Sequence, residues 1–136
     1  MSRIEQTLSI IKPDAVERNL QDQIKNEFKK NGFEILKEKK IHISKNEAEK
    51  FYKVHESKPF YNDLCAYLSS GPIVVMSLQK DNAVLENRKL MGATNPNDAD
   101  EGTLRKKYGI SIDKNSVHGS DSVENAKIEL DFFFKD

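Results

Sequence analysis

One histidine stands among small polar residues in the later part of the sequence. Residues 115–122 read NSVHGSDS, so His118 is followed by a glycine, which leaves room for a substrate to approach. Glu129 falls one heptad after Ser122 in a segment with helical spacing, and helical side chains lean towards the N-terminus. This spacing predicts that Glu129 reaches the His118 region. A carboxylate that fixes the proton on one imidazole nitrogen leaves the other nitrogen as a directed nucleophile or base.

An ordinary solvated histidine is the competing interpretation of this stretch. The residues that follow His118, namely Ser120, Asp121 and Ser122, are typical helix-capping residues. Asp121 with Glu124 three residues on predicts a capping box at the start of the last helix. A lone histidine in such a polar turn is commonly a surface residue, so spacing alone leaves both interpretations open.

Cations and polar side chains mark the ends of several other predicted elements. Guanidinium forks and ammonium groups match phosphate oxygens, so a set of this kind is typical of a polyphosphate site. Each member taken alone is equally typical of a solvated surface. The set comprises Lys12, Arg88, Thr94, Arg105 and Asn115.

Several familiar nucleotide and metal motifs are absent from the sequence. It contains neither GxxxxGK[ST] nor GxGxxG, so neither a P-loop nor a dinucleotide fingerprint is predicted. HExxH, paired cysteines and dense carboxylate clusters are also missing, which argues against a tightly held metal. Lys and Arg number 22, as do Asp and Glu, and this balance predicts no attraction to nucleic acid or to an anionic membrane.

Length and composition predict one soluble domain that spans residues 1–136. The hydrophobic fraction of 37% is enough to fill one core in a chain of this length. No apolar run resembles a signal peptide or a membrane span. The single cysteine, Cys65, excludes an intrachain disulfide and favours a cytoplasmic location, and its spacing relative to Leu64 and Leu68 indicates a core position.

Strand patterns alternate with helical patterns along the chain. This order favours an antiparallel sheet with helices on one face, an α+β fold. Asp81 is predicted to cap the helix that carries Arg88, and the last helix is predicted from Val123 to about Phe134. The strands predicted from apolar runs are 7–11, 33–43, 73–78 and a last strand that ends at Val117.

Two helical segments between the second and third strands are predicted to form a hairpin. Ser44 with Glu47 is a capping box at the start of the first segment. Pro59 interrupts the helical spacing, and a second short segment then runs from Phe60 to Ser69. The hairpin is therefore expected within residues 44–69.

Three motifs resemble those of the nucleoside diphosphate kinase family. NSVHGSDS matches the family's NxxHGSDS signature, IIKPDA at 10–15 matches its strand-end lysine motif, and GATNP at 92–96 matches its loop. The resemblance extends from about Thr7 to Phe134. It implies a ferredoxin-like βαββαβ sandwich, in which a four-stranded antiparallel sheet carries helices on its face and a helical hairpin is inserted. Residues 44–69 correspond to that insertion.

The resemblance implies transfer of the γ-phosphate of a nucleoside triphosphate, typically ATP, to a nucleoside or deoxynucleoside diphosphate. His118 is implied as the nucleophile, so a phosphohistidine and ping-pong kinetics are expected. Glu129 and Ser120 resemble the groups that orient the imidazole, and Lys12 is also implied in catalysis. Phe60 resembles an aromatic that stacks on the base between Leu64 and Ile112. The residues implied in nucleotide binding are Lys12, Tyr52, Phe60, Leu64, Arg88, Thr94, Arg105, Ile112 and Asn115.

The cofactor and assembly are also expectations that rest on the resemblance. Mg²⁺ is implied, held mainly through the nucleotide phosphates and without a dedicated protein cage. Members of the family are usually hexamers or tetramers built from a common dimer. Lys58 stands where many members carry arginine, and His55 matches no catalytic residue of the family.

Two other classes of function fit part of the sequence. Ferredoxin-like sheets also carry RNA-binding and regulatory modules, although the chain has no RNP-like aromatic motif on a predicted strand. A phosphohistidine relay that passes phosphate to a partner protein would need the same histidine. Discharge of the phosphorylated chain by nucleoside diphosphates separates the kinase from this relay.

Overall fold

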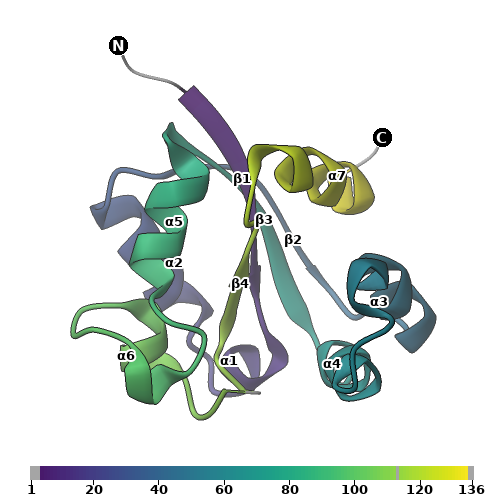
Figure 1. Ribbon diagram of the computed structural model, residues 1–136. Coiled ribbons are helices and arrows are strands. Elements are labelled where there is room, and N and C mark those ends of the chain that lie inside the picture. The colour runs from purple at the N-terminus through teal and green to yellow at the C-terminus, as the bar shows by residue number, and fades with distance from the viewer. Residues whose placement is uncertain (1–3, 113, 135–136) are drawn as a thin grey trace.

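A four-stranded antiparallel sheet organises the part of the chain that the computed structural model describes, residues 4–112 and 114–134 (Figure 1). The strand order is β2-β3-β1-β4, and every neighbouring pair is antiparallel. The strands are β1 (Ile4–Ile11), β2 (Glu34–Ile41), β3 (Ile73–Asp81) and β4 (Val117–Gly119). The structure confirms the α+β class and the ferredoxin-like sheet.

Helices cover both faces of the sheet, where one covered face was expected. Strand β1 explains this, because Ile11 packs into one hydrophobic core while Leu8 and Ile10 pack into another on the opposite face. The α-helices are α1 (Pro13–Glu17), α2 (Gln21–Lys30), α3 (Lys45–Phe51), α4 (Tyr61–Leu68), α5 (Ala83–Met91), α6 (Leu104–Tyr108) and α7 (Val123–Phe134). Short 3₁₀ turns occupy Lys53–His55 and Pro96–Asp98.

Each helix contributes to one of the two cores. Helices α2 and α5 lie together on one side of the sheet, whereas α3, α4 and α7 lie on the other (Figure 1). Ile24 and Phe28 of α2 are fully buried in the first core, and Leu68 of α4 is fully buried in the second. Within the described residues, no helix combines the length and apolar character needed to cross a bilayer.

Local signals fix the helical hairpin between β2 and β3. The Ser44 hydroxyl accepts a hydrogen bond from the Glu47 backbone N–H at 3.1 Å, and the Glu47 carboxylate accepts the Ser44 N–H at 3.0 Å. These reciprocal bonds satisfy donors at the start of α3 that have no partner within the helix. The predicted capping box and the hairpin formed by α3 and α4 are therefore confirmed.

Three predicted element boundaries are wrong. Asp81 belongs to β3, where it pairs with Ile4, so the strand continues past the position predicted for a helix cap. Val117 begins the last strand instead of ending it, because pairing with β1 extends through Gly119. Helix α7 is capped by Ser122, whose hydroxyl accepts the Asn125 N–H at 3.1 Å, and not by Asp121.

Candidate active site

His118 is held by a carboxylate that reaches it from α7. His118 pairs with Ile10 in the sheet, and its Nε2 lies 3.1 Å from Glu129 Oε1. The Ser120 hydroxyl donates to the same oxygen at 2.8 Å and accepts the Leu8 backbone N–H at 3.3 Å. Because a carboxylate only accepts, Nε2 carries the proton in this contact, and in the neutral imidazole Nδ1 then has the lone pair. The predicted approach of Glu129 is present, and it leaves a nucleophilic nitrogen.

Two aromatic side chains restrict the orientation of the His118 ring. The Phe51 ring meets it edge to face, with ring centroids 5.3 Å apart, and the Tyr52 ring lies 6.4 Å away. The His118 side chain is only 20% exposed. The sequence did not identify Phe51 as a site residue, because its place in an apolar helical stripe is typical of a core residue.

Gly119 allows helix α5 to pack directly against β4. A Cβ atom at this position would lie 2.3 Å from Asn87 Nδ2 and 2.7 Å from Met91 Cε. The space over Gly119 is therefore filled by α5, so the expected room for a substrate does not lie beside the glycine. The glycine instead fixes how closely α5, which carries Arg88, approaches the histidine strand.

Lys12, Asn115 and Thr94 are brought together from three distant parts of the chain. Lys12 follows β1, and its Nζ donates to Asn115 Oδ1 at 2.9 Å. The amide nitrogen of Asn115 in turn donates to the Thr94 carbonyl at 3.0 Å. Lys12 and Asn115 are 6% and 2% exposed, so the ammonium group is held in a defined place. A fixed, desolvated cation interacts strongly with a phosphate oxygen.

Arg88, Arg105 and Thr94 line a cavity of about 570 Å³, together with Lys89 and the acidic residues Asp98 and Asp100. Arg105 is anchored there, because its two terminal nitrogens donate to the carbonyls of Gly92 and Val117, each at 3.0 Å. Burial and the nearby charge of Arg88 lower the pKa of Arg105 to about 10. The guanidinium is still charged at neutral pH, and an anion bound between Arg88 and Arg105 would relieve the repulsion between these two cations.

The predicted base-binding residues differ in their exposure. Phe60 is 48% exposed, and the Lys58 ammonium lies 5.7 Å from the centre of its ring. Ile112 is 53% exposed, whereas Leu64 packs against the second core. The His55 ring lies 6.2 Å from the Phe60 ring. An exposed aromatic face of this kind can stack on a nucleobase.

Tyr52 lies between these aromatic residues and the histidine. Its ring is 6.2 Å from the ring of His55, and its side chain is buried. Burial raises the pKa of Tyr52 well above its ordinary value, and the charge of Glu129 adds to the effect. The hydroxyl is therefore protonated at neutral pH and can donate to an anionic ligand.

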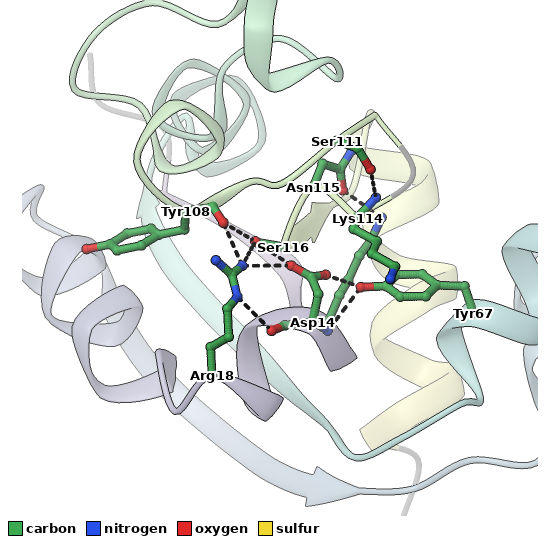
Figure 2. A network of polar contacts seen from close by, with 9 residues as sticks. Asp14, Arg18, Tyr67, Tyr108, Ser111, Lys114, Asn115 and Ser116 are labelled. Carbon is green, nitrogen blue, oxygen red and sulfur yellow. Dashed lines mark hydrogen bonds and ion pairs between the residues drawn. The ribbon is translucent and has the colours of Figure 1, made fainter.

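Sequence reasoning also missed a polar network beside Lys12, drawn in Figure 2. It connects Asp14 and Arg18 at the start of the chain with Tyr67 of α4 and with Ser116. Asp14 lies within the IIKPDA motif, and this was the one signal that could have identified it.

Comparisons with known proteins give consistent matches over nearly the whole chain. The family model for nucleoside diphosphate kinase matches residues 5–136. The chain is 53% identical over 131 residues to a nucleoside diphosphate kinase from Geotalea uraniireducens (strain Rf4), and the alignment covers 96% of each protein. It is 55% identical over 132 residues to one from Campylobacter jejuni (strain RM1221), covering 97% of this chain and 96% of that one.

Solved structures agree with the sequence matches. The chain resembles the Aquifex aeolicus nucleoside diphosphate kinase with a TM-score of 0.96 and 34% identity, covering 98% of this chain and 96% of that one. It resembles the nucleoside diphosphate kinase from Encephalitozoon cuniculi with a TM-score of 0.93 and 37% identity, covering 97% of this chain and 90% of that one.

The fold is that of a phosphotransferase, and Lys12 and Arg105 are hydrogen-bonded to the segment that carries the histidine. The matches make this class more specific, and the chain belongs to the nucleoside diphosphate kinase family. It is a transferase that moves the terminal phosphate of a nucleoside triphosphate to a nucleoside diphosphate.

Proposed function

We propose that His118 Nδ1 attacks the γ-phosphorus of a bound nucleoside triphosphate. A P–N bond forms while the bond to the β-phosphate oxygen breaks, and the donor leaves as the diphosphate. An acceptor diphosphate then reverses these steps and takes the phosphoryl group. The contact between His118 Nε2 and Glu129 carries this proposal, because it directs the free nitrogen and its carboxylate stabilises positive charge on the ring.

Fixed cations would stabilise the transition state of this transfer. Phosphoryl transfer is loose and in line, so its charge is spread over the phosphoryl oxygens and catalysis depends on positioning and electrostatics. We assign Lys12, Arg88 and Arg105 as the cationic ligands. Tyr52, Thr94 and Asn115 are the neutral polar ligands in this proposal. Ser120 supports the reaction indirectly by donating to Glu129.

Magnesium would enter the site with the nucleotide as part of the substrate. Across residues 4–112 and 114–134, no group of three or more His, Cys, Asp or Glu side chains is arranged to hold a metal. Mg²⁺ commonly binds substrate phosphates and keeps several waters, so the proposal needs no such group. The ion would neutralise phosphate charge, while Lys12 and the two arginines orient the phosphates.

A labelling experiment tests the proposed reaction. The pure protein is incubated with Mg²⁺ and γ-labelled ATP, and the label on the chain is expected to be acid-labile and base-stable. Each nucleoside diphosphate should then discharge it, because the phosphohistidine lies on the reaction path. Absence of label would contradict the proposed chemistry. If proteins remove the label and nucleoside diphosphates do not, the result would favour a phosphate relay.

Replacement of Phe60 with alanine is expected to weaken the binding of all nucleotides by a similar amount. Every base offers a π-face, so loss of a stacking partner should cost about 1–3 kcal/mol whatever the base. The measurement is kcat/KM for ATP, GTP, CTP and UTP with the wild type and the variant. Selective loss for one base would show that hydrogen bonds to the base edge, and not stacking between Leu64 and Ile112, hold the nucleotide.

We further propose that residues 1–136 act as one domain in a homo-oligomer, a hexamer or a tetramer built from dimers. Strand β2 lies at an edge of the sheet, and such an edge can pair with another chain. Ile4 and Ile128 are exposed by 63% and 66%, which also favours contact with a further copy. A cytoplasmic location is supported by the buried free thiol of Cys65.

A further inference from the structure

A buried carboxylate lies two residues after Lys12. The Asp14 side chain is 4% exposed and accepts hydrogen bonds from three different residues (Figure 2). The Tyr67 hydroxyl donates to Oδ1, while Ser116 Oγ and Arg18 Nη2 donate to Oδ2 at 2.7 and 3.0 Å. Burial of a carboxylate is costly unless it is paired and hydrogen-bonded, so these contacts define the position of Asp14.

The partners of Asp14 come from the two sides of the proposed nucleotide site. Tyr67 belongs to α4, the helix that begins immediately after Phe60, and its hydroxyl also accepts the Asp14 backbone N–H at 3.0 Å. Ser116 follows Asn115, and its carbonyl accepts the Lys12 N–H at 2.8 Å. Asp14 therefore connects the helix on the base side with the segment that carries the phosphate ligands.

Ser116 is held in a conformation that it would not adopt freely. Its φ angle is +74°, in the left-handed region that non-glycine residues rarely occupy. Its side chain is fully buried, and its hydroxyl also lies 3.0 Å from Arg18 Nη2. A strained residue persists only when its surroundings hold it, and the Asp14 carboxylate is a charged partner that does so.

We propose that Asp14 is a positioning residue, which fixes the separation between the base-binding helix α4 and the phosphate ligands Lys12 and Asn115. This inference rests on the proposed function, in which Phe60 holds the base. A nucleotide must engage both parts of the site at once, so a rigid connection between them spares it the cost of aligning them. Burial and the neighbouring carboxylate raise the pKa of Tyr67, which keeps its donor proton in place at neutral pH.

The test is a double-mutant cycle of Tyr67→Phe with Phe60→Ala, measured as kcat/KM for ATP. Tyr67→Phe keeps the ring and removes only the hydroxyl, and it is expected to lower kcat/KM about tenfold. In the Phe60→Ala background the loss should shrink below about threefold, because alignment no longer matters once the base is not held. Equal losses in the two backgrounds would overturn the inference and assign the hydroxyl to general stability.

Tyr61→Phe is the matched control on the same helix. The Tyr61 hydroxyl donates to the Glu49 carbonyl at 2.9 Å, which lies within the hairpin and not at Asp14. Its removal is expected to change kcat/KM by less than about twofold, with thermal unfolding recorded for every variant. A loss as large as that of Tyr67→Phe would also overturn the inference.

Ser116→Gly provides a second route to the same conclusion. It removes the other hydroxyl from Asp14 and also relieves the strain at φ +74°, so a loss of activity cannot come from backbone strain. A loss that again shrinks with Phe60→Ala supports the inference, and an unchanged kcat/KM contradicts it. If Phe60→Ala alone retains full kcat/KM, the proposed base site fails and the inference fails with it. Losses that are additive with Phe60→Ala overturn the inference alone.

Discussion

Replacement of His118 with alanine is expected to leave less than about one part in 10⁴ of the wild-type transfer rate. The variant lacks the only atom that we propose forms a bond to the phosphoryl group. Lys12 and the arginines would still bind nucleotide phosphates, so affinity for Mg²⁺-ADP in calorimetry should change little. A coupled assay measures the loss of turnover, and γ-labelled ATP measures the loss of covalent label.

His42→Ala is the matched control for the nucleophile. The sequence has three histidines, and His42 is exposed, with Nε2 located 2.8 Å from the Ser69 carbonyl. This variant should retain both label and turnover. Substantial turnover by His118→Ala, or loss of label in His42→Ala, would transfer the proposed chemistry to another residue.

Lys12→Ala should lower kcat by about 10²–10³-fold, a typical loss when one preorganised donor to a developing charge is removed. Its Nζ is buried and fixed by Asn115, so neither water nor a neighbouring lysine can easily replace it. The measurement is the rate at which ATP phosphorylates the enzyme in a single turnover. Its dependence on ATP concentration gives the rate at saturation and the apparent affinity separately. The larger effect is expected in the rate.

Lys106→Ala controls for the loss of one positive charge. Lys106 is an exposed residue that follows Arg105 on α6, and its removal should change kcat less than about twofold. If Lys12→Ala raises KM and leaves kcat unchanged, Lys12 binds the ground and transition states equally and its proposed catalytic part is wrong.

Local patterns predicted the elements whose sequence signals lie close together in the chain. The run from Ile73 to Leu78 and the capping box at Ser44 are examples, since both signals lie within a few positions of sequence. Helix α1 was not predicted because its five residues are too few to show a helical period. Strand β4 has three residues and depends on pairing with β1, so its start at Val117 was misplaced.

The site residues also divide into those with a local sequence signal and those joined by distant contacts. Glu129 could be placed near His118 because seven positions of helix connect it with Ser122 on one face. The contact of Lys12 with Asn115 joins residues 103 positions apart, and the sequence grouped them only by residue type and by the motif resemblance. Asp14 looks like an ordinary acidic residue at a helix start, and its burial follows from Tyr67 and Ser116, which no local pattern reveals.

The pairing of β1 with β4 has a consequence for the chain while it is being synthesised. Leu8 and Ser120 bond across 112 positions, and contacts so distant in sequence form late because a long loop must close. A ribosome would release Lys12, Phe60 and Arg88 well before His118 and helix α7. A half-made chain would therefore hold the proposed cationic ligands without the proposed nucleophile, and ATP is not expected to phosphorylate it.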